Sequence, residues 1–296
     1  MLVCLPAGHE NAKAWQHMEE EMPRWASVAQ EQDELMRAPL IAALVVSGAI
    51  TPALSAPQLA PHRAVYDMEL AQTADSSFSQ GFGRIVIEMS DACDGFIVSQ
   101  RQRIELITRD GTSFPSDVNG STWEAKDGGL YRFSVERLEG MNGPARQVGR
   151  ATLADGGTGI AAYRMPEDME EVELPKGTMF PTTHLAATLD AAKAGKPVFS
   201  APLFDGYEPK VYEVSAAISP ARAEPADADY PFADQKAWSV RFAFYDHGSA
   251  EAVPSYEIDL HLYANGVASE VRFDYGDFRL EGRLSNYEPL PRAQCD

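Results

Sequence analysis

Residues 256–284, YEIDLHLYANGVASEVRFDYGDFRLEGRL, decide the fold. Apolar and polar side chains alternate through three segments, which Asn265-Gly266 and Gly276-Asp277 separate. A period of two residues places one row of side chains in a core and the other in water, as in a β-strand with one buried face. Asn-Gly is the pair that best supplies the positive φ angles of a two-residue type I′ turn. The stretch therefore predicts an antiparallel meander, and we expect the rest of the chain to be organised around it.

The chain before this stretch repeats the pattern. Turn residues recur at intervals of roughly ten positions with β-branched and aromatic runs between them, which is typical of a meander or barrel. No internal repeat or domain linker interrupts it, and the Pro/Ala/Asp-rich segment 219–234 is predicted to be an exposed loop. We therefore predict an all-β protein in which residues 56–296 form one large antiparallel sheet curled into a barrel. The clearest further strands are residues 62–70, 82–90, 96–108, 210–218 and 238–245.

One segment breaks the β pattern. Residues 182–194 predict a helix of about three turns, which Thr182 or Thr183 would cap and which Gly195, before Pro197, would end. Its apolar stripe consists of Leu185, Ala186, Leu189 and Ala192. A curled sheet can leave an apolar cavity inside, and this helix would then plug or gate that cavity.

Length and charge limit the possible functions. The chain has 296 residues, of which 45% are hydrophobic and 23% charged, so it can bury a sizeable core. Its net charge of −19 argues against binding to nucleic acid, because phosphates require a basic surface. The same charge argues against electrostatic docking of the whole protein on an anionic membrane.

Residues 36–55 have the pattern of a secretory signal. Met36-Arg37 precedes an apolar run over residues 38–50, and small residues follow. Cleavage after Ser55 fits best, because Ala53 and Ser55 form the small pair that a signal peptidase requires. A membrane anchor would need about 20 apolar residues, and no later segment could span a bilayer. We therefore expect the protein to be exported.

Residues 1–35 do not fit a signal peptide, because they are acidic and a signal normally begins with basic residues. We expect Met36 to be the true initiator, which makes residues 1–35 a non-native extension. A genuine extension that is discarded with the signal is the alternative.

The three cysteines agree with export. Cys4 belongs to the extension, which leaves Cys93 and Cys295 as an even pair in an oxidising compartment. A bridge between them would close a loop of roughly 200 residues and contribute on the order of 5 kcal/mol to stability. The alternative is two separate buried thiols, but Cys295, one residue from the end, is poorly placed to be buried alone. We predict the disulfide.

The sequence offers little catalytic chemistry. It contains no nucleophile elbow, no Ser-x-x-Lys, no His-Glu-x-x-His and no Walker loop. His184, at the start of the predicted helix, is a candidate general base, although packing or capping is the more common role of such a residue. Asp274 and Asp277 are candidate paired carboxylates, but acids beside a turn glycine usually bind backbone. The histidines after residue 55 lie at no metal-binding spacing, so no metal site, catalytic residue or cofactor is assigned; they are His62, His184, His247 and His261.

Several short motifs, in order, resemble the EipB family of envelope-integrity proteins of Gram-negative bacteria. The resemblance covers nearly all of residues 57–296 and implies a periplasmic spiral β-barrel with an associated helix and one disulfide, which would join Cys93 to Cys295. It implies a role in maintaining the cell envelope and supplies no catalytic residues. The motifs are Cys93-Asp94-Gly95 with Gln100-Arg101, Ser116-Asp117 before Trp123-Glu124, Leu174-Pro175-x-Gly177-Thr178-x-Phe180-Pro181-x-x-His184, Phe204-Asp205-Gly206, Asn265-Gly266-Val267, Asp274-Tyr275-Gly276-Asp277-Phe278 and Cys295.

Three functions remain to be compared. The first is a non-catalytic periplasmic protein that maintains envelope integrity by binding an envelope protein or lipid component. The second is a periplasmic carrier of a lipid or lipoprotein acyl chain, which requires an apolar barrel cavity, with His184, Leu185 and Leu189 on the helix that would gate it. The third is a hydrolase that uses His184. An open, aromatic-lined interior would favour the carrier, and a filled interior would favour the first function.

Overall fold

The computed structural model describes residues 59–71, 76–139, 144–154, 157–164, 169–222 and 230–295. These residues belong to one compact unit. The extension, the signal and its cleavage site, all predicted within residues 1–55, lie outside the described residues.

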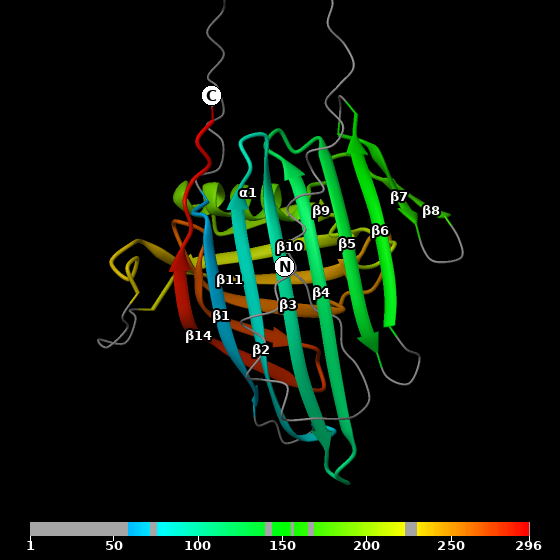
Figure 1. The fold of residues 1–296 in the computed structure, drawn as a ribbon, viewed down its shortest axis with the longest axis vertical. Coiled ribbons are helices and arrows are strands. Elements are labelled where there is room, and N and C mark those ends of the chain that lie inside the picture. Colours follow the sequence, from blue (N-terminus) through cyan, green and yellow to red (C-terminus); the bar gives the residue numbers. More distant parts are fainter. Residues whose placement is uncertain are drawn as a thin grey trace, which may run out of the picture. The chain divides into compact units, whose positions relative to one another are not determined.

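The described chain is mostly antiparallel sheet with a single helix, which confirms the all-β prediction (Figure 1). One sheet contains all fourteen strands in the order β8-β7-β6-β5-β4-β3-β2-β1-β14-β13-β12-β11-β10-β9. Consecutive strands therefore pair except β8 and β9, which lie at the two ends of the order, and β1 and β14, the first and last strands of the chain, pair in the middle. The strands are β1 (His62–Ala71), β2 (Phe78–Asp91), β3 (Gly95–Thr108), β4 (Ser113–Ala125), β5 (Leu130–Glu139), β6 (Pro144–Leu153), β7 (Gly159–Arg164), β8 (Met169–Leu174), β9 (Val198–Leu203), β10 (Tyr212–Pro220), β11 (Ala237–Asp246), β12 (Tyr256–Tyr263), β13 (Ala268–Asp274) and β14 (Arg279–Pro289).

The sheet curls on itself, so that β9–β12 cross behind β1–β5 (Figure 1). One apolar core joins the two layers, since it contains Ile85 and Ile104 from the front strands together with Val214, Phe242 and Leu260 from the rear ones. The end strands β8 and β9 are not paired with each other in the described sheet. The two ends of the sheet therefore do not join in a closed ring, and the curled sheet is an open spiral.

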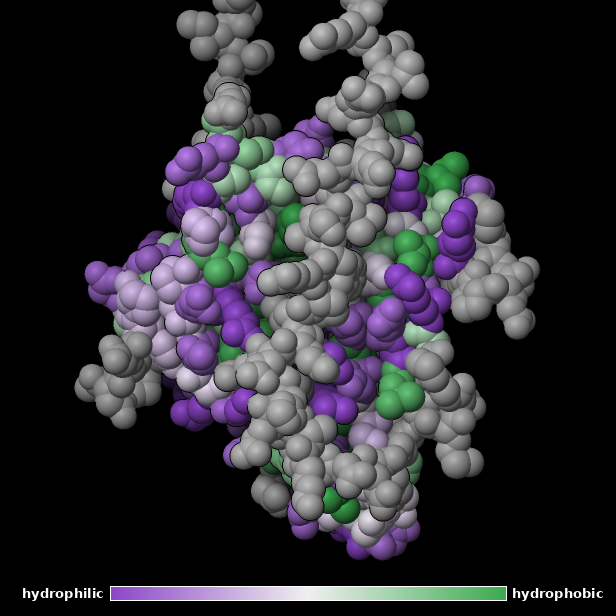
Figure 2. All heavy atoms as spheres, in the orientation of Figure 1, coloured by the Kyte–Doolittle hydropathy of each residue, from purple (hydrophilic) through white to green (hydrophobic). Residues whose placement is uncertain are grey.

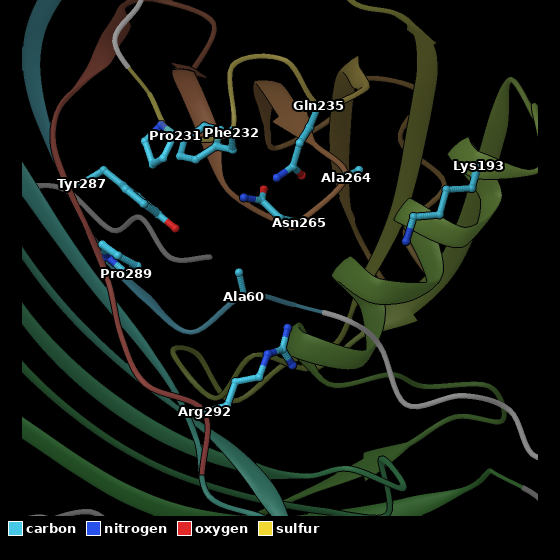
Figure 3. Close-up of a pocket in the computed structure, with 10 residues that line it drawn as sticks. All are labelled: Ala60, Lys193, Pro231, Phe232, Gln235, Ala264, Asn265, Tyr287, Pro289 and Arg292. Atoms are coloured by element: carbon cyan, nitrogen blue, oxygen red, sulfur yellow. The ribbon is translucent and has the colours of Figure 1, made fainter. Parts of the chain in front are cut away.

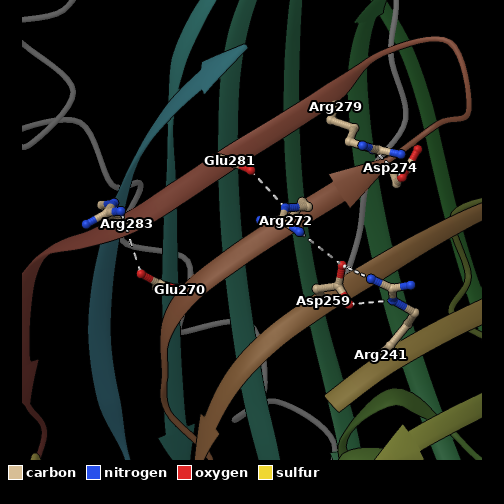
Figure 4. A network of polar contacts seen from close by, with 8 residues as sticks. All are labelled: Arg241, Asp259, Glu270, Arg272, Asp274, Arg279, Glu281 and Arg283. Atoms are coloured by element: carbon tan, nitrogen blue, oxygen red, sulfur yellow. Dashed lines mark hydrogen bonds and ion pairs between the residues drawn. The ribbon is translucent and has the colours of Figure 1, made fainter. Parts of the chain in front are cut away.

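The stretch that decides the fold forms β12, β13 and β14 as predicted. Its apolar row points into the core, where Leu260, Phe273 and Leu280 are at most 5% exposed. Its polar row carries ion pairs between neighbouring strands on the outer face (Figure 4). In one of them, Nε and Nη2 of Arg241 donate to the two carboxylate oxygens of Asp259 at 2.7 and 3.1 Å. Such exposed pairs contribute about 0–1 kcal/mol each, so the buried row stabilises this part of the sheet.

The turn at Asn265-Gly266 differs from the prediction. Tyr263 and Val267 close a loop of three residues, since the N–H of Tyr263 donates to the carbonyl of Val267 at 2.8 Å. Gly266 has φ +89°, whereas Asn265 does not have positive φ, so a type I′ turn is excluded. The N–H of Gly266 donates to the carbonyl of Tyr263 at 2.9 Å, as in a type I turn followed by a left-handed glycine.

The helix α1 (Pro181–Lys193) lies beside β9 and β10 (Figure 1), and its start also differs from the prediction. Its N-cap is Phe180, and neither threonine caps it. The carboxylate of Glu124, on β4, instead accepts the backbone N–H groups of Thr182 and Thr183, each at 2.7 Å. The buried carboxyl group of Glu124 thus satisfies donors at the helix N-terminus that have no partner within the helix, while burial raises the pKa of this group.

The end of α1 is as predicted. Gly195 has φ +72°, and its N–H donates to the carbonyl of Ala192 at 3.1 Å. The N–H of Lys196 donates to the carbonyl of Ala191 at 2.9 Å, which completes a Schellman motif. The last residue of the helix, Lys193, is thereby held at a fixed place on the surface.

Of the loop predicted over residues 219–234, the structure describes residues 219–222 and 230–234, and not all of these are exposed. Strand β10 extends to Pro220, and Phe232 returns to the core with 2% exposure. Its ring packs against Tyr230, Tyr263 and Tyr287 at centroid distances of 5.5, 4.9 and 4.8 Å. The composition of the segment indicated a loop, but one aromatic residue within it anchors the loop to the barrel.

Candidate functional site: a cleft beside the C-terminal strap

The chain after β14 is tied down at both ends. We call residues 290–295 the C-terminal strap. The N–H of Leu290 donates to the carbonyl of Pro61 at 3.0 Å, and Cys295 forms a disulfide with Cys93, with the Cα atoms 5.7 Å apart. Cys93, in the turn between β2 and β3, has φ +59°. The structure thus contains the disulfide that the cysteine pattern and the family resemblance predicted.

A cleft of about 550 Å³ opens beside this strap (Figure 3). Its walls come from segments that are distant in the sequence: the entry to β1, the end of α1, the turn before β11, the β12–β13 loop, the end of β14 and the strap. The lining residues are Ala60, Lys193, Pro231, Phe232, Gln235, Ala264, Asn265, Tyr287, Pro289 and Arg292. A volume of this size accommodates a small organic ligand.

The wall of the cleft is fixed by backbone hydrogen bonds and aromatic packing. The N–H of Ala60 donates to the carbonyl of Asn265, and the N–H of Ala264 to the carbonyl of Lys236, both at 2.9 Å. The buried ring of Phe232 supports Tyr287 edge-on. Because these contacts join four separate segments of the chain, the folded structure itself fixes the shape of the cleft.

The charged residues of the cleft are basic. Lys193 has its nearest described carboxylate, Asp190, at 3.9 Å, and Arg292 forms no ion pair with any described residue. The pKa of Asp91 is lowered mainly by its hydrogen bond from Lys126, and the charge of Arg292 lowers it by a smaller amount. No aspartate or glutamate belongs to the described lining. In a chain with 44 acidic and 25 basic residues, this local excess of positive charge favours an anionic ligand.

Neutral polar groups complete the lining. Figure 3 shows the side chains of Gln235, Asn265 and Tyr287 directed toward the middle of the cleft. The Oδ1 atom of Asn265 accepts the N–H of Val267 at 3.0 Å, which orients its amide and leaves the NH2 group as a donor. Burial raises the pKa of Tyr287, so its hydroxyl keeps its proton and can donate. The arrangement suits binding of a ligand with several oxygen acceptors.

The residues singled out from the sequence lie elsewhere. His184 is 4% exposed, with its ring 5.4 Å from that of Phe199 and 5.8 Å from that of Phe242. Its Nε2 atom has no hydrogen-bond partner in the described chain, and burial lowers its pKa to about 4. Leu189 is in the core and Leu185 is half-buried against it. None of the three lines the cleft, to which α1 contributes Lys193.

Of the two candidate carboxylates, Asp277 is exposed and Asp274 has a structural role. Asp274 accepts the N–H of Gly276 at 2.9 Å and pairs with Arg279 at 2.5 Å, so it serves the β13–β14 turn. Within the described ranges, no three potential ligands gather as a metal site. The one described helix is too short to cross a membrane.

Sequence reasoning missed the cleft residues. Gln235, Tyr287 and Arg292 belong to no motif, and Asn265 was noted for its turn. One feature of the sequence pointed to part of the cleft. Arg292 lies three residues before Cys295, whose predicted disulfide would place a basic side chain near Cys93.

The fold and the cleft define a curled antiparallel barrel whose C-terminus is fastened by a disulfide beside a cationic cleft. The model of the family described as EipB-like matches residues 53–291. The cell envelope integrity protein EipB of Brucella abortus is 30% identical over 240 residues, which are 78% of this chain and 85% of that protein. A crystal structure of a β-barrel-like protein of a domain of unknown function, also from Brucella abortus, superposes with a TM-score of 0.71 and 29% identity, over 79% of this chain and 99% of that one. The chain belongs to the EipB-like family.

Proposed function

We propose that this protein maintains the integrity of the cell envelope from the periplasm, as a non-catalytic protein that binds a protein or lipid component of the envelope. The envelope role follows the name of the relative from Brucella abortus. Binding is supported by one observation above others: a formed cleft whose described charged residues, Lys193 and Arg292, are both basic. The absence of described acidic groups from the lining favours capture of an anionic group.

The carrier hypothesis has less support. A carrier of acyl chains needs an open apolar interior. The interior between the two layers instead holds packed side chains, among them Tyr66, Ile104, Phe242 and Phe273, each at most 6% exposed. The hydrolase hypothesis also has less support, because its residue, His184, is buried with 4% exposure.

The test is complementation of a strain that lacks the gene. The strain should become sensitive to detergents and to antibiotics that act on the cell wall, and the wild-type gene should restore resistance. A Lys193→Ala/Arg292→Ala gene should restore it poorly, whereas the matched variant Lys196→Ala/Arg283→Ala, which removes two exposed cations outside the cleft, should restore it fully. Full rescue by the cleft variant would refute the cleft as the working site.

Two measurements on the protein purified from the periplasm test the remaining parts. N-terminal sequencing should begin at Ala56, and a protein found in the cytoplasm with residues 1–55 attached would contradict export. Native mass spectrometry should show a barrel without bound acyl chains. A stoichiometric co-purifying lipid would favour the carrier instead.

A further inference from the structure

Lys193 and Arg292 are brought to the cleft by two separate anchors. Lys193 ends α1, which the Schellman motif at Gly195 terminates at a defined place. Arg292 lies within the strap, between the hydrogen bond of Leu290 and the disulfide of Cys295. A lysine at a helix C-terminus also interacts favourably with the helix dipole. That interaction explains Lys193 alone and gives no reason for Arg292, a second cation from the strap, to line the same cleft. The pair is therefore a feature of the cleft.

The donor types indicate which anion fits. A guanidinium binds phosphate or carboxylate through two parallel hydrogen bonds, and an ammonium adds a compact charge. Two cations match the charge of a phosphate monoester, which is close to −2 at neutral pH, better than that of a single carboxylate. The Asn265 amide and the Tyr287 hydroxyl supply further donors for its terminal oxygens.

The rest of the lining suits a body attached to that phosphate. Pro231, Phe232 and Pro289 form apolar wall, and the Gln235 amide can both donate and accept. The volume of about 550 Å³ exceeds what a phosphate ion needs. A hydroxylated body the size of a sugar fills such a space and matches its mixture of polar and apolar groups.

We propose that the cleft binds a phosphate monoester carried on a sugar-sized body, with Arg292 and Lys193 on the phosphate and Gln235 on the body. The proposal deepens the proposed function and rests on it for its biological setting. The same chemistry occurs on a phosphorylated lipid headgroup and on a soluble sugar phosphate, so the experiment separates these sources.

Isothermal titration calorimetry of the disulfide-bonded mature protein is the first arm. Glucose 1-phosphate should bind, glucose should not, and glucuronate should bind at least about tenfold more weakly, which is about 1.4 kcal/mol. Arg292→Gln and Lys193→Gln should each weaken the binding of glucose 1-phosphate about tenfold or more, and the melting temperature of each variant should be that of the wild type. The matched variant Arg283→Gln, on the outer face of β14, should bind glucose 1-phosphate as the wild type does. Equal binding of glucose, or no binding of glucose 1-phosphate and inorganic phosphate, would overturn the proposal.

Vesicle co-sedimentation is the second arm. Phosphatidylcholine vesicles containing phosphatidylinositol 4-phosphate, which carries a monoester on a hydroxylated ring, should retain the protein if the source is a lipid. Vesicles containing phosphatidylinositol, which has the same ring and only a diester, should retain it less. If the vesicles retain the wild type and Arg292→Gln abolishes this retention, the ligand comes from a lipid. If only the soluble ester binds, the ligand is a soluble sugar phosphate. Equal retention on both vesicle types, insensitive to Arg292→Gln, contradicts the monoester preference.

Complementation separates this proposal from the proposed function. If no phosphate probe binds while Lys193→Ala/Arg292→Ala still fails to rescue the strain, the ligand class is wrong and the site stands. If phosphate binds and the same variant rescues fully, the cleft has a ligand but not the envelope role.

Discussion

The buried imidazole of His184 should make the fold sensitive to acid. In an unfolded chain its pKa is about 6.5, and in the folded protein burial lowers it to about 4. Between these values the unfolded chain binds a proton that the folded protein does not. Acid therefore favours unfolding: the contribution of His184 is fully favourable above about pH 6.5 and is lost as the pH falls to about 4.

The size of the effect follows from the two pKa values. At about 1.4 kcal/mol per pH unit, the gap between 6.5 and 4 corresponds to a loss of about 3 kcal/mol below pH 4, of which about 2 kcal/mol is already lost at pH 5. His184→Leu has nearly the same volume and does not titrate. It also removes no hydrogen bond of Nε2 within the described chain, because that atom makes none.

Urea unfolding at pH 7.5 and pH 5.0, followed by circular dichroism, measures the effect. Burial also lowers the pKa of His62, so the wild type alone would not isolate His184. The quantity to compare is the loss of unfolding free energy between the two pH values, which should be about 2 kcal/mol smaller in His184→Leu than in the wild type. Equal losses in the two proteins, at equal m-values, would refute the reasoning.

Three further changes test the other structural arguments by urea unfolding. Cys93→Ser/Cys295→Ser opens a loop with a sequence separation of 202 residues and should cost about 5 kcal/mol; a loss below about 1 kcal/mol would show that the tie adds little. Glu124→Gln leaves one oxygen where two accept N–H groups at the start of α1 and should cost about 1–3 kcal/mol, with faster hydrogen exchange in that helix; unchanged exchange would contradict the capping role. Gly266→Ala places a Cβ 2.6 Å from Cδ2 of Leu59 at φ +89° and should cost about 1–3 kcal/mol, so a neutral result would mean that the loop adopts another shape.

The sheet could be predicted because its signal is local. Ile258, Leu260 and Leu262 alternate with polar residues, and one-sided burial is what produces such a row. The end of α1 was equally local, since Gly195 alone supplies the left-handed residue that a Schellman motif needs. Where a residue acts through its own backbone or its own strand, the sequence around it is sufficient.

The failures have a common physical cause, which is contact across the fold. Thr182 follows the rule for an N-cap, but the acceptor at that helix end is Glu124, 58 residues earlier in the chain. Asn265-Gly266 favours a two-residue turn, yet the ladder closes at Tyr263 and Val267, where Leu59 packs against Gly266. Phe232 lies in a segment with the composition of a loop, and its burial depends on rings from β12 and β14. No local pattern encodes these partners.

The cleft is the extreme case of this dependence, and it links the disulfide to binding. Residue 292 lies beyond the last strand, so no sheet hydrogen bond fixes it. Its position instead depends on the N–H of Leu290 on one side and the bond to Cys93 on the other. Both cysteines of the disulfide are exposed, and the effect of the bond on stability acts mainly through the unfolded chain. Its effect on the folded protein is local: it restricts the strap, and a restricted Arg292 loses less conformational entropy when it meets an anion than a free one would. One covalent bond thus serves both the fold, by tying the strap to the turn between β2 and β3, and the cleft, by holding Arg292 in place.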